Sequence, residues 1–421
     1  MIENKITGAD LSLYEESFNN NLKVFYVPIP NKKEYYISYV TRFGSNITSY
    51  QKGKNNINLP LGIAHFLEHK NFEQEDKVNP FNYYNKFGTE VNALTTYNFT
   101  EYYCTGSTNF EEDLDYLIKF VNMPYYTDEN VEKEQGIIAQ ELKMYNDNPN
   151  YVINRTLLNS IFKTHPTRND IGGTIDSIKK ITPKKLYDCF KTFYTSDNMF
   201  IVITGNIDID KASVVINKRL DDLLRKEKYN IKEIEEQDEI IIKKKIINAN
   251  IEVSKLHMGV KINRNKLGKY DDFELKQYLS IINMLLFGKT TKFIEETNND
   301  NLYVDFYSYT ETVDNFTLLL IKATTEEYNK LINRIEKTFN EIEISEKDFE
   351  RCKKVIISDF IKDTTKIDIV NDLVVNSIIN NNKVYTNYIN IIKSLKYETL
   401  LKILRKIDFN NKSIVVMEKN N

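Results

Sequence analysis

Two of the four histidines in this chain of 421 residues stand in one pentad, His65-Phe66-Leu67-Glu68-His69. Residues at positions i, i+3 and i+4 of a helix project from one face, so the two imidazoles and the carboxylate lie within about one turn of each other. Imidazoles bind zinc, and a hydrolytic zinc site needs three protein ligands with water in the fourth position. Glu68 is placed to take a proton from that water, whose pKa the metal lowers to about 7. The pentad therefore predicts two zinc ligands and a general base.

The pentad alone leaves a second interpretation open. The same five residues also fit a surface helix on which both histidines are solvated and bind no metal. The order H-x-x-E-H inverts the more common H-E-x-x-H arrangement of zinc hydrolases, and it supplies only two ligands. The third ligand has to come from another part of the chain.

A strong helix is predicted over residues 128–146, after the capping signal Thr127-Asp128 and before Asn148-Pro149. Within it, Glu134 and Glu141 are about two turns apart and therefore share a face. Charged helix positions are usually only solvated, so these glutamates become site candidates through their combination with the pentad.

Together, the two segments resemble the pitrilysin/insulinase family of zinc metallopeptidases. The resemblance rests on Gly62-Ile63-Ala64-His65-Phe66-Leu67-Glu68-His69 and on Glu134-Gln135-Gly136-Ile137-Ile138-Ala139-Gln140-Glu141.

For the site, the resemblance implies one Zn²⁺ per chain, held by His65, His69 and Glu141, with Glu68 as the base. It also implies that Glu134 is the family's second acidic residue near the metal. Glu134 is therefore grouped with Glu68 among the catalytic residues and is not a ligand.

The stretch 87–105 is predicted to form two strands around a polar turn. The family resemblance implies that Asn92 and Ala93 belong to an edge strand beside the zinc, on which an extended peptide substrate pairs as an added strand. Such main-chain pairing places little demand on the substrate's sequence. An ordinary interior strand is the alternative.

One position departs from the family pattern. Active members commonly carry an arginine and a tyrosine in the second half that reach the substrate; Tyr303 matches the tyrosine, whereas Glu296 stands at the arginine position. A carboxylate lacks the donor fork of an arginine. Either this chain binds substrate differently or a related subunit supplies these residues, which leaves a heterodimer and a homodimer open.

The order of predicted elements repeats along the chain and indicates an α+β protein. The first half, 1–224, carries the metal site; a charged linker follows at 225–239; the second half, 240–421, has a helix at 271–287 without histidine where the pentad helix would recur. The family resemblance implies two similar αβ-roll halves, each a mostly antiparallel sheet flanked by helices, which face one another as a clamshell.

Composition excludes several classes of partner. The formal net charge of −3 is too small to indicate a nucleic-acid or acidic-membrane partner. No apolar run reaches the roughly 20 residues that span a bilayer, and the N-terminal residues lack a signal-peptide pattern, so a cytoplasmic location is expected. Cys104, Cys189 and Cys352 are far apart and are interpreted as unpaired thiols.

The predicted function is zinc-dependent hydrolysis of short or unfolded peptides by an endopeptidase or oligopeptidase. A two-chain peptidase that matures or degrades peptides, with this chain as the catalytic subunit, fits the departure at Glu296. The alternative is a non-catalytic family member that acts as a binding or assembly subunit.

Overall fold

The structure is a computed structural model that describes residues 1–224 and 228–420, so the first three residues of the predicted linker lie outside the described residues. The chain forms two compact units, each assembled from separate stretches of sequence. Unit 1 comprises residues 1–143, 169–233 and 360–388, and unit 2 comprises residues 144–168, 234–359 and 389–421. The continuous halves 1–224 and 240–421, and their clamshell arrangement, remain predictions.

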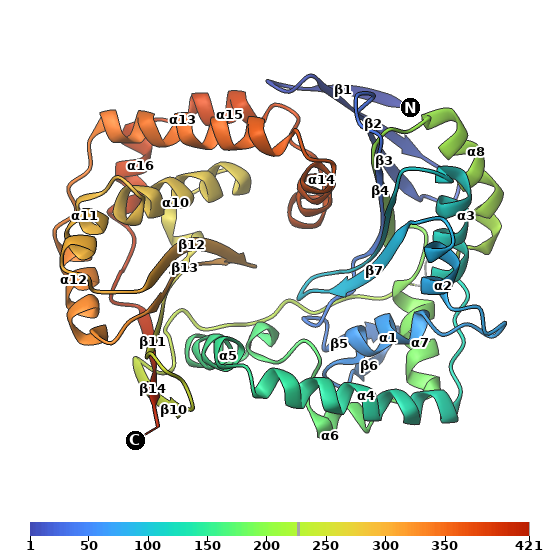
Figure 1. The fold of residues 1–421 in the computed structure, drawn as a ribbon, viewed down its shortest axis with the longest axis horizontal. Helices are drawn as coiled ribbons and strands as arrows, with labels where there is room; N and C mark the ends of the chain where they lie inside the picture. The colour runs from blue at the N-terminus through green and yellow to red at the C-terminus, as the bar shows by residue number, and fades with distance from the viewer. Residues whose placement is uncertain (225–227, 421) are drawn as a thin grey trace. The chain divides into compact units, whose positions relative to one another are not determined.

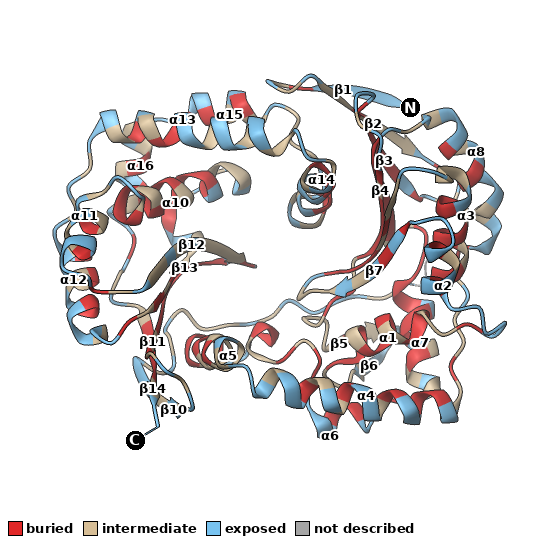
Figure 2. Ribbon diagram, viewed as in Figure 1, coloured by how far each residue is buried: buried red, intermediate tan, exposed pale blue. Residues whose placement is uncertain are grey.

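Unit 1 is built on a seven-stranded sheet in the order β1-β2-β3-β9-β4-β8-β7, in which only the pair β3 and β9 is parallel. Its strands are β1 (Ile2–Ile6), β2 (Leu11–Ser17), β3 (Lys23–Pro28), β4 (Tyr35–Thr41), β7 (Glu90–Thr95), β8 (Thr100–Gly106) and β9 (Met199–Gly205). Figure 2 shows that β4 is buried along nearly all of its length, as expected for a strand with a layer on each face. The hairpin β5 (Ser49–Lys52) and β6 (Asn55–Asn58) forms a separate two-stranded sheet.

Unit 2 repeats the strand order from β3 to the β7 edge of this sheet. Its five-stranded sheet has the order β10-β14-β11-β13-β12, with β10 and β14 parallel and the other pairs antiparallel. The strands are β10 (Lys244–Ala249), β11 (Lys255–Asn263), β12 (Asp305–Val313), β13 (Phe316–Thr324) and β14 (Lys412–Lys419). Strand order and direction match β3-β9-β4-β8-β7, which confirms the prediction of two similar, mostly antiparallel αβ halves.

Helices cover both sheets (Figure 1). Those of unit 1 are α1 (Ile63–Asn71), α2 (Pro80–Asn85), α3 (Phe110–Val121), α6 (Ile175–Ile178), α7 (Pro183–Phe193), α8 (Ile209–Arg219) and α14 (Ile367–Asn381). Those of unit 2 are α5 (Pro149–Ile161), α9 (Arg264–Leu267), α10 (Asp272–Phe287), α11 (Lys292–Asn299), α12 (Tyr328–Asn340) and α16 (Tyr397–Leu404). Three more helices cross the boundaries between the units: α4 (Asp128–Asn146), α13 (Glu346–Asp363) and α15 (Tyr388–Ser394). Among the described residues, no helix combines the length and apolar character needed to cross a bilayer.

Each unit contains one helix that comes from the other part of the sequence. Helix α14, from late in the chain, packs on strands β3, β4 and β9 of unit 1 (Figure 1), while α5, from early in the chain, packs on β11 and β14 of unit 2. Apolar residues of α14 such as Val370 and Val374 bury against Val40 and Val202 of the sheet. This exchange explains why each compact unit is discontinuous in sequence.

A buried polar chain fixes α14 to the sheet. Asn371 Nδ2 donates to the carbonyl oxygen of Val202 at 3.2 Å, so its Oδ1 faces Ser38 Oγ at 2.6 Å. Ser38 Oγ also makes a short contact with Oε1 of Glu101. One hydroxyl proton cannot serve two acceptor-only oxygens, so a protonated Glu101 that donates to Ser38 satisfies all three groups. Burial raises the pKa of Glu101 to about 7, and the nearby Asp372 adds to the rise although the Ser38 hydrogen bond opposes it.

This chain makes stability depend on pH. Because the pKa of Glu101 is higher in the folded protein than its ordinary 4.5, folding favours the protonated form, and stability falls as pH rises from about 4.5 to about 7. Glu101→Gln keeps a donor toward Ser38 without the charge. We expect it to stabilise the protein by about 3 kcal/mol at pH 8 and to change little at pH 4.5, measured by chemical denaturation. Equal effects at both pH values would contradict the protonated assignment.

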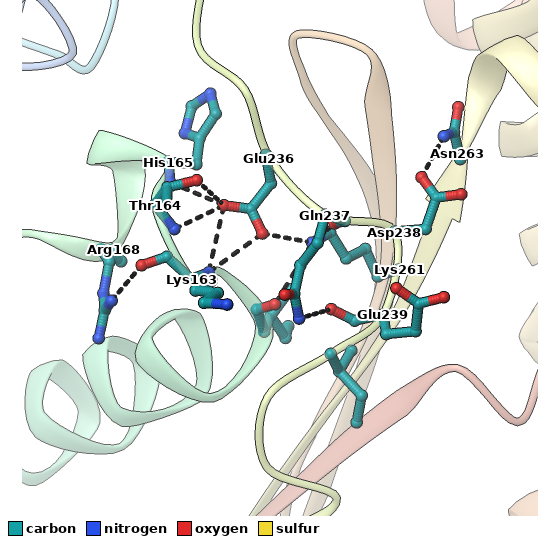
Figure 3. Close-up of polar contacts among 12 residues, drawn as sticks. Lys163, Thr164, His165, Arg168, Glu236, Gln237, Asp238, Glu239, Lys261 and Asn263 are labelled. Atoms are coloured by element: carbon teal, nitrogen blue, oxygen red, sulfur yellow. Dashed lines mark hydrogen bonds and ion pairs between the residues drawn. The ribbon is translucent and has the colours of Figure 1, made fainter.

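The last part of the predicted linker is docked against unit 2 (Figure 3). The side chain of Glu236 is 1% exposed, and its carboxylate accepts from the backbone N–H groups of Lys163, Thr164 and His165 just beyond the end of α5. The fully buried Lys261 of β11 donates to Glu236 Oε1 at 2.8 Å. Burial alone would raise the pKa of Glu236, but Lys261 and the three backbone donors outweigh it and hold the pKa at about 2.

Glu236→Gln is expected to destabilise the protein by about 3 to 5 kcal/mol, because it leaves the buried ammonium of Lys261 without its carboxylate. The measurement is the denaturant midpoint at neutral pH. Glu235→Gln, an exposed neighbour, is the matched control and should change the stability by less than about 0.5 kcal/mol. A variant of Glu236 as stable as this control would show that the contact contributes nothing.

Candidate metal centre

Helix α1 carries the pentad and begins where the chain makes a tight turn. Its N-cap Gly62 has a φ of 87°, and a Cβ there would meet the carbonyl oxygen of Gly172 at 2.2 Å, so only glycine fits. The apolar residues Ile63, Phe66 and Leu67 of the helix are buried in the core of unit 1. This burial leaves His65 and His69 together on the partly exposed face of the helix.

Helix α4 brings the glutamates, and its bounds confirm the predicted helix over 128–146. Asp128 and Glu129 in its first turn suit the positive end of the helix dipole. Val131, Ile138 and Leu142 are buried at helical spacing and dock this helix on unit 1. Glu134 and Glu141 lie on the side that faces α1, since both contact His69.

His65, His69 and Glu141 converge, with one donor atom from each lying within 4.8 Å of the others. His65 Nε2 lies 3.7 Å from Glu141 Oε1, and His69 Nε2 lies 3.6 Å from Glu141 Oε2. Ligand atoms at about 2.1 Å from a tetrahedral zinc are roughly 3.4 Å apart, so these separations suit a shared cation. Within residues 1–224 and 228–420, this is the one group of His, Cys, Asp and Glu side chains with such spacing.

One carboxylate oxygen of this group is left without a hydrogen-bond partner. Glu141 Oε2 is buried and has no hydrogen-bond partner among the described residues. A buried acceptor without a donor is costly, and a cation between the three side chains removes that cost. Two imidazole nitrogens and one carboxylate oxygen are also the donor set of catalytic zinc sites. The residues present therefore fit zinc.

Burial and neighbouring charges shift the pKa values of the two imidazoles in opposite directions. Burial, with His69 nearby, lowers the pKa of His65 to about 3, so this ring is neutral and keeps a lone pair for a metal. For His69, burial lowers the pKa, but the hydrogen bond with Glu134 and the carboxylates of Glu68 and Glu141 outweigh it and raise the pKa overall.

Glu134 orients the His69 ring by contacting Nδ1, the ring nitrogen that is not directed at Glu141. Its Oε1 lies 3.0 Å from His69 Nδ1, which leaves Nε2 directed at Glu141. A carboxylate on the second ring nitrogen fixes the tautomer and orientation of a metal-binding histidine. The contact supports the prediction that Glu134 lies beside the site without being a ligand.

Glu68 lies beside the histidines and is held by a residue that the sequence argument did not select. Thr95 Oγ1, at the end of β7, donates to Glu68 Oε2 at 2.8 Å. Burial raises the pKa of Glu68, while His69 and the Thr95 hydrogen bond act in the opposite direction. Thr95 belongs to the predicted strand, but its contact with the pentad helix depends on tertiary packing and has no signal in the sequence.

Strand β7, which carries Asn92 and Ala93, is an edge strand. It is the last strand of the sheet in unit 1 and pairs with β8 on one side only among the described residues. Asn92 is exposed and Ala93 is partly exposed. The strand therefore has a free edge, although substrate binding by these two residues remains a prediction.

The two second-half positions lie in unit 2. The partly exposed Tyr303 ring packs against Phe306 with centroids 5.3 Å apart. Glu296 on α11 pairs with Arg334 on α12, with Oε2 and Nη1 2.6 Å apart. Glu296 is thus engaged by a cation of its own unit, and the role of Tyr303 at the metal remains a prediction.

Similarity to known proteins agrees with this site. Residues 54–175 match the family described as "Insulinase (Peptidase family M16)", and residues 180–356 match the "Peptidase M16 inactive domain". The protein called "Uncharacterized zinc protease YmfH" in Bacillus subtilis is 34% identical over 363 residues, which are 83% of each chain. The chain belongs to the insulinase family of M16 peptidases.

Solved structures share the fold. A crystal structure of an M16-like peptidase from Alicyclobacillus acidocaldarius aligns with a TM-score of 0.92 at 26% identity and covers 99% of this chain and 100% of that chain. Pitrilysin aligns with a TM-score of 0.79 at 17% identity over 99% of this chain, which corresponds to 46% of pitrilysin. The latter similarity concerns the fold alone.

Glu141→Gln is expected to weaken zinc binding by more than about 100-fold, because it removes a charged ligand, whereas changes outside the ligand shell cost 10- to 100-fold. The purified chain should carry about one zinc, and the variant much less, by metal analysis after dialysis. Glu132→Gln, an exposed residue of the same helix, is the control and should retain the zinc. Full zinc content in Glu141→Gln would exclude Glu141 as a ligand.

Proposed function

We propose that this protein is a zinc-dependent endopeptidase or oligopeptidase that hydrolyses short or unfolded peptides. The observation that carries the proposal is the convergence of His65, His69 and Glu141 with Glu68 beside them. Three protein ligands leave a fourth zinc position for water, which is the arrangement of a catalytic site. Family membership and relatives named zinc proteases support the same chemistry.

His65, His69 and Glu141 would hold the zinc. When bound, zinc supplies Lewis-acid chemistry, because it lowers the pKa of water at its open position and polarises a substrate carbonyl. Glu68 takes the proton of the attacking water and later delivers it to the leaving amine. Thr95 keeps the Glu68 carboxylate oriented through the hydrogen bond to Oε2. Glu134 acts through His69 and touches neither water nor substrate.

The peptide substrate would lie along β7. Its backbone would pair with the free edge at Asn92 and Ala93 as an added strand, which gives affinity without a strict sequence requirement. Tyr303, by family resemblance, is proposed to contact the substrate carbonyl. This binding mode suits extended peptides, because the substrate backbone must be free of internal pairing to add as a strand.

We further propose that a second chain completes the enzyme. Glu296 stands at the family's arginine position and is neutralised within its own unit by Arg334. A related subunit that provides the missing guanidinium, in a heterodimer, is one solution, and a homodimer is its rival. The cytoplasm is the proposed location, and the free, buried thiols of Cys104, Cys189 and Cys352 agree with a reducing compartment.

The rival function is a binding or assembly subunit without catalysis. The matched "inactive domain" concerns residues 180–356, outside the pentad and α4. A subunit that has lost catalytic activity has little physical reason to keep both histidines, Glu68 and Glu141 together. The complete donor set therefore favours catalysis.

Glu68→Gln is expected to retain zinc while lowering the cleavage rate of a quenched peptide by about 10²- to 10⁴-fold, because it removes the general base. The assay is run on the purified chain and on the chain with any subunit that co-purifies from the native cell. Glu129→Gln, an exposed residue at the start of α4, is the control and should cleave at the wild-type rate. Undiminished cleavage by Glu68→Gln would remove Glu68 from the mechanism. A wild-type chain that binds zinc and cleaves no peptide, alone or with its partner, would favour the assembly role.

A further inference from the structure

Lys70, the residue directly after the pentad, is completely buried. Its side chain is 0% exposed, although it carries an ammonium group on a helix that borders the candidate metal centre. A buried charge without a partner is very costly, so lysines in such places are paired with carboxylates. The partners of Lys70 show what its charge does.

Two carboxylates lie beside the ammonium of Lys70 within the described part of the chain. One belongs to Glu73, which lies just beyond the C-terminal end of α1 and is partly exposed. The other is Glu134 of α4, whose Oε2 lies 3.9 Å from Lys70 Nζ. At 3.9 Å this second contact is an ion pair and too long for a hydrogen bond.

The two oxygens of Glu134 therefore have different partners. Oε1 lies 3.0 Å from His69 Nδ1, and Oε2 faces Lys70. Only 10% of the Glu134 side chain is exposed, so water contributes little to stabilising its charge. The ammonium compensates the charge of this buried carboxylate and holds it in place beside the imidazole.

We propose that Lys70 is a positioning residue for the metal centre, which acts on His69 through Glu134. The ammonium fixes the Glu134 carboxylate, the carboxylate holds the Nδ1–H tautomer of His69, and Nε2 keeps its lone pair toward Glu141. This inference rests on the proposed zinc site and extends it to a residue that touches neither metal nor substrate.

Two effects of Lys70 on a bound cation oppose each other, and their balance is measurable. A positive charge near zinc repels it, so its removal by itself would tighten zinc binding. Loss of an outer-shell partner that orients a ligand weakens metal binding by about 10- to 100-fold. Orientation is expected to outweigh repulsion, because the Glu134 carboxylate, with Oε2 toward Lys70 and Oε1 toward His69, offsets the charge of the ammonium.

The test is a double-mutant cycle on the full chain, with zinc affinity measured by competition against a chromogenic chelator. Lys70→Met is expected to weaken zinc binding by about 10-fold. In a Glu134→Gln background the same change should have almost no further effect, because the carboxylate through which Lys70 acts is already neutral. Glu73→Gln is the matched control; it alters the other partner of Lys70 and should leave the zinc affinity within about threefold of wild type.

Unfolding of the zinc-free variants, followed by circular dichroism, reports whether they retain the fold. Should Lys70→Met lack a cooperative transition, Lys70→Gln replaces it in the same cycle as an uncharged but polar side chain. Unchanged or tighter zinc binding in the folded variant, or additive effects with Glu134→Gln, would overturn the proposal. A wild-type chain that binds no zinc would overturn the proposed function as well, whereas wild-type affinity in Lys70→Met would overturn this inference alone.

Discussion

The arrangement of the elements around the candidate metal centre depends on one constraint: the charges of a largely buried cluster must be compensated. Glu68, Glu134 and Glu141 gather there against two imidazoles, and each carboxylate is mostly removed from water. Such a cluster is stable only if cations or hydrogen-bond donors compensate it. Lys70 and Thr95 supply part of this compensation from within the unit. The remaining demand, at Glu141, would be met by the proposed zinc ion.

The fold meets this constraint with rigid elements. Helices α1 and α4 bury their apolar faces in the core of unit 1, and the polar faces that remain carry the candidate ligands and the residues that contact them. Strand β7 then places Thr95 against Glu68 at the end of a free sheet edge. Base, ligands and the proposed substrate strand are thus parts of one packed body, which is how a site keeps its geometry.

The rest of the fold consists of two sheets with a similar strand order and of two helices that pack in the unit of the other part of the sequence. Five strands recur in the same order in both sheets, yet only the first sheet is accompanied by the His65–His69 pentad. Helices α5 and α14 are exchanged between the parts of the sequence, and polar anchors hold both segments: Glu236 beyond the end of α5, and Asn371 within α14. Among the described residues, unit 2 therefore has the repeated strand order without a second group of the kind found at His65, His69 and Glu141.

The sequence alone predicted two zinc ligands, a base and the repeated order of strands and helices, because these depend on residue type and on spacing along one element. Glu141 became the third candidate ligand only through the family resemblance. The sequence did not indicate the strands β1 and β2, whose residues are largely polar or exposed. Only the tertiary structure decided that α14 covers the first sheet, that Thr95 holds Glu68, and that Lys70 is buried behind Glu134. Those facts depend on contacts between residues far apart in sequence, and a local pattern specifies an element but not the surface on which it packs.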